Sequence, residues 1–358
     1  MWYKHFVTSN DFYLTIRKKA KGKQPRLIMV KDVTPPVTGK SFVLEAPVVI
    51  LIGPTAVGKT DLALSLAEQF DGEIVGADSM QIYRYMDIGT AKPTSEEQAR
   101  VAHHLIDIVD PDEDYQAARY GADALQACRE ITARGRMPLV VGGTGLYIRA
   151  LELGVFDIEP VPETIRCRIR ERLARQGRAL LFEELRRIDP ESAARLHPND
   201  TQRLLRALEV FEATGVPWSA HLAAHQRTPQ LKRVLKIGLN CGRDEVYARI
   251  NRRCRQMLDL GLVDEVRKLL AMGYAGSLKS MQAIGYRHVL NYLAGEWSLA
   301  QTVELLARDT RRYAKRQYTW FTRDAAINWR HPGQGSEIAT LIQDFLAGRP
   351  AGKENINR

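Results

Sequence analysis

The sequence predicts an α/β protein: a P-loop parallel sheet flanked by helices, with a mostly helical insertion domain. Three observations predict this fold. An apolar run of strand length, Val48 to Ile52, leads into the loop GPTAVGKT at residues 53–60, and an apolar helical stretch follows. Short apolar strands then alternate with helices, which is typical of a parallel sheet covered on both faces. After Leu153 the sequence becomes helical and rich in arginine.

Residues 1–46 form a basic N-terminal extension. They contain nine Lys and Arg against three Asp and Glu, with most of the basic residues between Arg17 and Lys23. No apolar signal-peptide core is visible. The segment could be a weakly ordered arm, a processed targeting sequence, or the result of a start assigned upstream of Met29. We expect it to be poorly ordered.

The loop at residues 53–60 has the pattern of a phosphate-binding loop, between a strand and a helix as that pattern requires. Its backbone N–H groups would converge on phosphate oxygens at a helix N-terminus. Lys59 would add a positive charge, and the Thr60 hydroxyl would bind Mg²⁺. The predicted anion-binding residues are Gly53, Pro54, Thr55, Ala56, Val57, Gly58, Lys59 and Thr60. An ordinary glycine turn is the alternative, and the loop alone names neither a nucleotide nor a reaction.

The rest of the first core segment, residues 47–153, continues the alternation. Strands are predicted at 73–77, 105–109 and 138–141, and a helix at 116–134. Ligands of such sheets bind beyond the carboxyl ends of the strands. Three polar turns are expected there: the phosphate loop, residues 77–79 and residues 142–145.

Residues 154–200 are predicted to be a helical insertion domain. Between positions 165 and 187 there are eight arginines against three glutamates, with Ile165, Ile169 and Leu173 at helical spacing and a break at Gly177. A solvated surface explains such a run as well as an RNA-binding face does. The core is expected to resume at 201–345, before a tail at 346–358.

A one-sided cationic face is predicted near the C-terminal end. Residues 308, 311, 312, 315 and 316 are all Arg or Lys, and they share one face of a helix. The face lacks compensating acids in this pattern, which favours binding of a phosphate backbone over simple solubility. Tyr313, Gln317, Trp320 and Phe321 fall on a different, mostly apolar face that we expect to pack on the core.

Bulk composition agrees with a polyanionic partner. Lys plus Arg exceed Asp plus Glu by 52 − 42 = 10, and the pI is about 9.4. The four cysteines show no metal-binding spacing and are expected to be buried reduced thiols. His103-His104 is a weak metal candidate. No apolar run is long enough to span a membrane, so we expect a soluble, cytoplasmic protein, and a monomer.

Asp78 and Thr144 are the candidate catalytic side chains. Each follows a predicted strand at the edge that carries the phosphate loop. An aspartate there could hold Mg²⁺ through water or act as general base. A Thr that begins a helix is also a common N-cap, and Asp78 could cap a turn in the same way. The residues alone leave capping and catalysis equally open for both.

A series of motifs resembles the tRNA dimethylallyltransferase family, over about residues 47 to 330. The motifs are DSMQIYR at 78–84, MDIGTAKP at 86–93, HHLID at 103–107, GGTGLY at 142–147, HPND at 197–200, QRLLRALE at 202–209, AIGYR at 283–287 and AKRQ at 314–317. This order of motifs is far more specific than the loop alone. The chain shows no zinc finger after them, which favours the bacterial type.

The resemblance implies transfer of a dimethylallyl group from its diphosphate to the exocyclic amine of the adenine just 3′ of certain anticodons. The loop would then bind an allylic diphosphate with Mg²⁺. Catalysis is assigned to Asp78, Thr144 and Lys59, and the metal contact to Thr60. The implied tRNA contacts are Asp78, Ser79, Met80, Gln81, Thr144, Arg166, Gln202, Arg203, Leu204, Leu205, Arg206, Gln282, Ala283, Ile284, Gly285, Tyr286, Arg287, Arg308, Arg312, Lys315 and Arg316.

Three other functions compete with this one. A P-loop small-molecule kinase explains the loop and sheet but leaves the basic surfaces unused. An adenylate isopentenyltransferase shares the loop and the Asp-Ser turn, yet has less need of a basic surface of tRNA size. A non-catalytic tRNA-binding protein leaves Lys59, Thr60 and Asp78 without a role.

Overall fold

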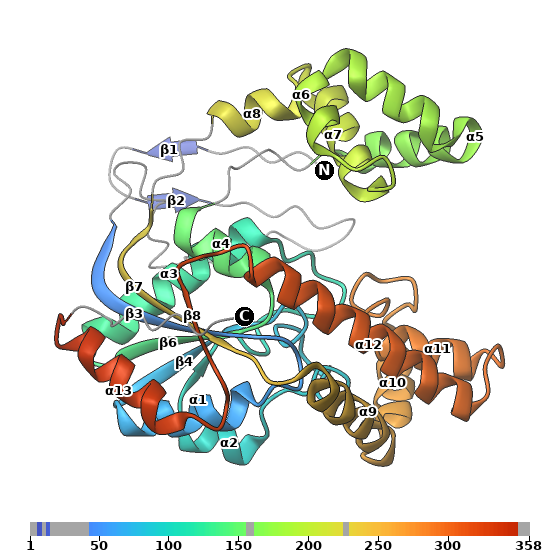
Figure 1. Cartoon of the computed structure of the whole chain (residues 1–358). Helices are drawn as coiled ribbons and strands as arrows, with labels where there is room; N and C mark the ends of the chain where they lie inside the picture. Colours follow the sequence, from blue (N-terminus) through green and yellow to red (C-terminus); the bar gives the residue numbers. More distant parts are fainter. Residues whose placement is uncertain (1–5, 9–11, 15–42, 155–160, 225–228, 350–358) are drawn as a thin grey trace. The chain divides into compact units, whose positions relative to one another are not determined.

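Six parallel strands form the central sheet, in the order β5-β4-β6-β3-β7-β8 (Figure 1). This computed structural model describes residues 6–8, 12–14, 43–154, 161–224 and 229–349. The strands are β3 (Leu44–Ile52), β4 (Gly72–Ala77), β5 (His103–His104), β6 (Met137–Gly142), β7 (Leu231–Leu239) and β8 (Ile327–Arg330). β4 is buried along its whole length and β3 along its second half, because helices cover both faces of the sheet.

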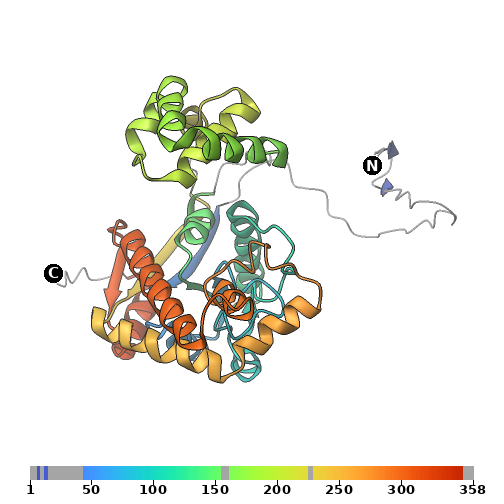
Figure 2. The ribbon, with the colours of Figure 1, turned by 90° about the vertical axis from the view of Figure 1, so that its right-hand side faces the viewer.

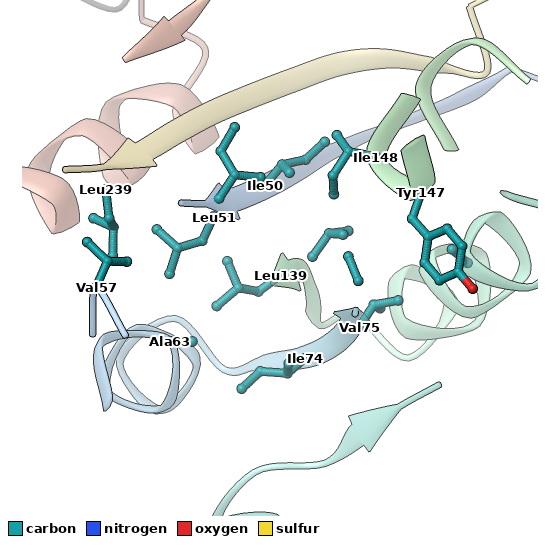
Figure 3. Packing of buried hydrophobic residues seen from close by; sticks show 14 of the residues in the cluster. Ile50, Leu51, Val57, Ala63, Ile74, Val75, Leu139, Tyr147, Ile148 and Leu239 are labelled. Carbon is teal, nitrogen blue, oxygen red and sulfur yellow. The ribbon is translucent and has the colours of Figure 1, made fainter. Parts of the chain in front are cut away.

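Helices α1 and α13 pack on one face of the sheet, and α3 and α4 pack on the other. The helices of this core are α1 (Lys59–Gln69), α2 (Ser95–Arg100), α3 (Ala117–Ala133), α4 (Gly145–Leu153), α9 (Arg243–Asp259), α10 (Leu262–Ala271), α11 (Tyr286–Leu293), α12 (Leu299–Phe321) and α13 (Gly335–Leu346). Figure 3 shows Ala63 of α1 and Ile148 of α4 meeting the buried strand residues Ile50, Leu51 and Leu139. This burial is the main source of stability for the core.

The strands end in register where the predicted turns begin. Ala77 pairs with Gly142, and Gly142 pairs with Ile52, so β4, β6 and β3 finish side by side. The phosphate loop, Asp78 and Thr144 follow these three ends directly. The prediction that the three polar turns share one edge of the sheet is therefore confirmed.

The helical segment has a hydrophobic core of its own. It contains α5 (Glu163–Ile188), α6 (Pro190–Arg195), α7 (Thr201–Thr214) and α8 (Trp218–Ala224). Ile169 and Leu181 of α5 are buried together with Leu204 and Leu208 of α7. The boundary predicted at residue 200 therefore falls inside this packing unit, because the apolar face of α7 is covered by α5.

Two of the expected local features differ from the structure. The strand predicted at 105–109 is wrong: β5 is only His103–His104, and Leu105 and Asp107 have left-handed backbones with φ of 61° and 55°, which ends the strand. Strand β3 begins at Leu44, inside the segment predicted as extension. The break expected in the arginine-rich helix is present, because Gly177 interrupts α5 with a φ of 78°.

Residues 1–42 form a separate unit, in which β1 (Phe6–Thr8) pairs antiparallel with β2 (Phe12–Leu14). The expectation of poor order for the remainder of this unit lies outside the described residues. In the part of the chain that the structure describes, no helix is long and apolar enough to cross a membrane. Cys128, Cys241 and Cys254 are buried as expected, whereas Cys167 is exposed on α5.

Candidate active site

A cavity of about 820 Å³ opens at the carboxyl edge of β3, β4 and β6. One wall is the phosphate loop, and a second is the chain segment from Asp87 to Gln98. Helix α9 supplies a third wall with Arg249, Arg252 and Arg253. Asp78, Gln81 and Gln317 also line the cavity. The volume suits a ligand of a few tens of atoms.

The phosphate loop closes around the side chain of its own lysine. Lys59 Nζ donates hydrogen bonds to the carbonyls of Gly53 (2.9 Å) and Pro54 (2.7 Å). Gly58, the residue before α1, has a φ of 102°, a conformation that a residue with a Cβ would adopt only under strain. Gly58 is the N-cap of α1, so the loop ends at a helix N-terminus, where an anion is favoured.

Positive charge gathers in the cavity. Burial lowers the pKa of Lys59 to about 8, opposed by the negative charge of Asp78, while Arg253 lowers it further. Burial also lowers the pKa of Arg253. Among the described residues, Arg253 has no hydrogen-bond or ion-pair partner, whereas Arg249 donates to the Val57 carbonyl at 3.1 Å. Arg249 also pairs with Glu245 at 2.5 Å, so Arg253 is the cation in this group that is suited to an anionic ligand. Neither arginine was singled out in the sequence, because both lie in an amphipathic helix with many other charges.

Asp78 caps its turn and also lines the cavity. Its Oδ1 accepts a hydrogen bond from the Met80 backbone N–H at 2.8 Å. Burial raises its pKa, while this hydrogen bond and the charges of Lys59 and Arg253 act in the opposite direction. A partly buried carboxylate with a raised pKa beside an anion-binding loop is a candidate general base. Capping and catalysis are therefore compatible at this residue.

Thr144 occupies the N-cap position of α4, but its side chain does not cap that helix. Its Oγ1 instead accepts a hydrogen bond from the Ser79 backbone N–H at 3.1 Å and donates to Ser79 Oγ at 3.4 Å. Thr144 thus ties the end of β6 to the turn that carries Asp78. Tyr313 of α12 joins this group: burial and then the Asp78 charge raise its pKa, while its hydrogen bonds to Thr144 and Gln317 act in the opposite direction.

Gln317 was expected on the core-packing face of α12, and it is indeed buried, but it belongs to the site. Its Oε1 accepts a hydrogen bond from the Thr55 backbone N–H at 2.9 Å, and its Nε2 donates to the Gly143 carbonyl at 3.0 Å. A Cβ on Gly143 would lie 2.1 Å from Nε2, so only glycine allows this approach. The spacing pattern could not separate this amide from the apolar residues around it.

Glu265 of α10 is hydrogen-bonded to residues 87–89, which belong to the second wall of the cavity. Its carboxylate accepts hydrogen bonds from the backbone N–H groups of Asp87 (3.0 Å), Ile88 (2.7 Å) and Gly89 (3.1 Å), and from the Tyr286 hydroxyl (2.6 Å). Four donors on one carboxylate fix the chain firmly, since hydrogen bonds to a charged acceptor are the strong ones. No sequence pattern indicated Glu265.

The same wall is tied to the Asp78 turn by Gln81. Its Nε2 donates hydrogen bonds to the carbonyls of Thr90 (3.2 Å) and Ala91 (3.1 Å). Lys92 is buried and pairs with Asp87 and Asp107, each at 2.5 Å. Gln81, which the resemblance assigned to tRNA, therefore has a supporting role in the cavity wall.

Several residues assigned to tRNA are not accessible. Leu204 is buried in the core of the helical segment, and Gly285 and Tyr286 are buried in the main core, so none of the three presents an exposed surface to RNA in this structure. Arg166 is largely covered and pairs with Glu163 at 3.5 Å. Of the residues assigned to tRNA at 202–206 and 282–287, Gln202, Arg203 and Gln282 are exposed. Leu205, Arg206, Ala283, Ile284 and Arg287 are partly buried.

The cationic face of α12 contains an acid, contrary to expectation. Asp309 pairs with Arg308 (3.1 Å), Arg312 (3.5 Å) and Arg287 of α11 (2.7 Å). Arg311 turns away and donates to Asn251 of α9, which packs against α12 (Figure 2). We define the cationic face as the exposed side chains Arg308, Arg312, Lys315 and Arg316. The last two have no acid partner within the described ranges.

Because the cavity places a partly buried carboxylate beside an anion-binding loop, the fold and the site define a P-loop enzyme of the group-transfer class. A family model described as IPP transferase matches residues 81–324, and one described as isopentenyl transferase matches residues 46–107. The chain belongs to the tRNA dimethylallyltransferase family, since the first match alone covers more than half of its length.

Individual relatives agree with this assignment. The tRNA dimethylallyltransferase of Desulfotalea psychrophila is 52% identical over 303 residues, which are 85% of this chain and 96% of that protein. The crystal structure of a tRNA isopentenylpyrophosphate transferase from Bacillus halodurans is 40% identical, with a TM-score of 0.62, and the match covers 85% of this chain and 98% of that chain. A eukaryotic dimethylallyltransferase acting on tRNA is 27% identical with a TM-score of 0.74, over 87% and 82% of the two chains.

Proposed function

We propose that this chain transfers a dimethylallyl group from dimethylallyl diphosphate to the exocyclic N6 amine of the adenine 3′-adjacent to the anticodon in certain tRNAs, and releases pyrophosphate. The observation that carries the proposal is the placement of Asp78 and Lys59 in one cavity, at the edge where β3, β4 and β6 end together. This arrangement supports the proposal that an anion-stabilising loop and a base act on the same reacting centre.

The diphosphate is bound by the loop N–H groups, Lys59 and Arg253. As the bond between the allylic carbon and the diphosphate oxygen breaks, its electron pair leaves with pyrophosphate, and these groups stabilise the developing charge. Thr60 lines the cavity in a position suited to a metal. In the described part of the chain, no three His, Cys, Asp or Glu side chains gather as a metal site. That arrangement fits Mg²⁺, which commonly takes few protein ligands and several phosphate oxygens. Bound there, Mg²⁺ would neutralise diphosphate charge.

Asp78 acts on the adenine. The N6 nitrogen forms a bond to the allylic carbon and loses one proton, which passes to the Asp78 carboxylate. Thr144 and Ser79 hold the Asp78 turn in place through their mutual hydrogen bonds. The adenine must leave the stack of the anticodon loop to reach this cavity, and an unpaired loop base does so at low energetic cost. The cationic face then binds the RNA backbone.

The test is incubation of purified protein with tRNA, dimethylallyl diphosphate and Mg²⁺, followed by mass spectrometry of nuclease fragments. We expect added dimethylallyl mass on the adenine next to the anticodon and stoichiometric pyrophosphate. Prenylation of free AMP in preference to tRNA would instead identify an adenylate isopentenyltransferase. Turnover of ATP without any need for the allylic diphosphate would identify a kinase. The proposal also includes a monomeric enzyme, which light scattering can check.

A further inference from the structure

Two large apolar side chains are exposed beside the catalytic turn. Trp320 of α12 is 36% exposed, and Leu146 in the first turn of α4 is 47% exposed. Trp320 was predicted to pack on the core, but part of its side chain is exposed to solvent. Its indole rests on Gly145, where a Cβ would lie 2.1 Å from Nε1. Because Gly145 has no side chain, the indole packs directly on its backbone, and part of the indole surface remains exposed to solvent.

The position of this ring connects it to the site. Gly145 directly follows Thr144, whose hydroxyl holds Ser79 next to Asp78. On α12, Trp320 lies one helical turn beyond Gln317, which lines the cavity. Gln317 and Trp320 are three positions apart, so they lie on the same side of this helix.

The surroundings of the ring are cationic. Lys315 and Arg316 precede Trp320 on the helix, and Arg323 follows it. All three are exposed, and none pairs with an acid within the described residues. An apolar peptide or a lipid chain on the ring would leave these charges uncompensated. A nucleobase has an aromatic face and carries its own phosphate, so it satisfies both the ring and the cations.

We infer that Trp320, flanked by Leu146, is a stacking platform for the nucleobase that neighbours the extruded adenine in the anticodon loop. The inference rests on the proposed function, because it assumes that the adenine enters the cavity. Extrusion removes the neighbouring base from its own stack, and stacking on the indole compensates for that loss. Removing one base–aromatic stack lowers affinity by about 5- to 150-fold, and the effect is expected to depend little on which base is stacked.

The experiment compares Trp320→Ala and Trp320→Phe with Tyr318→Ala. Tyr318 is the matched control, since it is 40% exposed on the same helix but faces Trp329 and Asn240. The measurements are the dissociation constant and KM for a synthetic anticodon stem-loop RNA, and the KM for dimethylallyl diphosphate. We expect Trp320→Ala to weaken RNA binding by about 5- to 150-fold, with the KM for the diphosphate unchanged. Trp320→Phe should restore most of the affinity, and Tyr318→Ala should have no effect.

A second measurement keeps the test valid if Trp320→Ala folds poorly. Wild-type protein is assayed with RNAs that carry an abasic nucleotide on one or the other side of the target adenine. Wild-type protein should bind one of these RNAs about 5- to 150-fold more weakly than the intact RNA. Where Trp320→Ala folds, the two changes combined should cost little more than either alone. Full wild-type affinity for both abasic RNAs, or additive losses, would overturn the platform. No prenylation of intact RNA by wild-type protein would overturn the proposed function instead.

Discussion

Gln317 Oε1 accepts a hydrogen bond from the Thr55 backbone N–H at 2.9 Å, which joins the helix with the cationic face to the phosphate loop. The same side chain reaches the end of β6 through the Gly143 carbonyl. One helix therefore carries the exposed cationic face on one side and, on the other, the buried Gln317 side chain that is hydrogen-bonded to the phosphate loop. We expect this arrangement to set the relative position of the two substrates.

Replacing Gln317 with Leu should raise the KM for dimethylallyl diphosphate by about tenfold or more. The change leaves a buried N–H and a buried carbonyl without partners, and each such group costs about 1 to 3 kcal/mol. Thermal unfolding should show the loss of stability, and steady-state kinetics the change in KM. Thr319→Ala, on the exposed side of the same helix, is the control. An unchanged KM for the diphosphate would mean that Gln317 does not position the loop.

Asp78→Asn should abolish most of the turnover and leave RNA binding nearly intact. The amide oxygen can still accept the Met80 N–H, so the turn is retained while the base is lost. Loss of a general base lowers rates by about 10² to 10⁴. Single-turnover rates and RNA binding should be measured on the same preparation. A collapse of RNA binding would identify Asp78 as a recognition or structural residue.

The pH dependence of kcat/KM for the diphosphate should be bell-shaped. Asp78 must be ionised to accept a proton, so activity rises with pH through its pKa, which burial holds above the ordinary value of 3.8. Lys59 must be protonated to stabilise pyrophosphate, so activity falls as pH rises through its pKa of about 8. Bound diphosphate should raise that pKa, which moves the alkaline limb of kcat to higher pH. Equal alkaline limbs for kcat and kcat/KM would argue against contact between Lys59 and the diphosphate.

Glu73 should make the fold sensitive to acid. It is buried on β4, and its hydrogen bond from Arg134 lowers its pKa to about 2, with a further contribution from His104 and opposed by burial. The ordinary pKa is 4.5, so the stabilisation is complete above that pH and is lost as pH falls from 4.5 to 2. At neutral pH it amounts to about 3 kcal/mol. Urea unfolding of Glu73→Gln across this range should show a much flatter pH profile than wild type. Glu68→Gln, in an exposed pair with Arg100, should behave like wild type.

Glu265→Ala should release the segment at residues 87–89 from α10. Three backbone N–H groups lose their acceptor, so their amide hydrogens should exchange with solvent at least about tenfold faster. We also expect kcat/KM to fall, because this segment lines the cavity, while RNA binding by the cationic face persists. Glu265→Gln, which retains one oxygen acceptor, should be intermediate. Unchanged exchange at 87–89 would show that other contacts hold this wall.

Local patterns predicted much of the fold. The phosphate loop, the helix at 116–134 and the strands at 73–77 and 138–141 follow from apolar periodicity and glycine spacing, which are local properties. The position of the three polar turns at one edge of the sheet followed from the rule that the carboxyl ends of parallel strands lie on the same side of the sheet. The strand predicted at 105–109 is absent because two left-handed residues, Leu105 and Asp107, interrupt a mostly apolar segment. Leu204 and Tyr286 are buried, which the motifs that contain them could not reveal, because a motif does not show which of its side chains are covered.

The sequence by itself determined the fold class, the family and the identity of Asp78, Lys59 and Thr144 as candidate catalytic residues, because these depend on short motifs and their order. The tertiary structure alone decided which distant side chains support them. Gln317 lies 262 positions from Thr55, and Glu265 lies 178 positions from Asp87. It also placed Asp309 among the arginines of α12 and α11, and left Trp320 half open beside Gly145. Such contacts depend on the packing of α9 to α12 against the edge of the sheet, which no local pattern encodes.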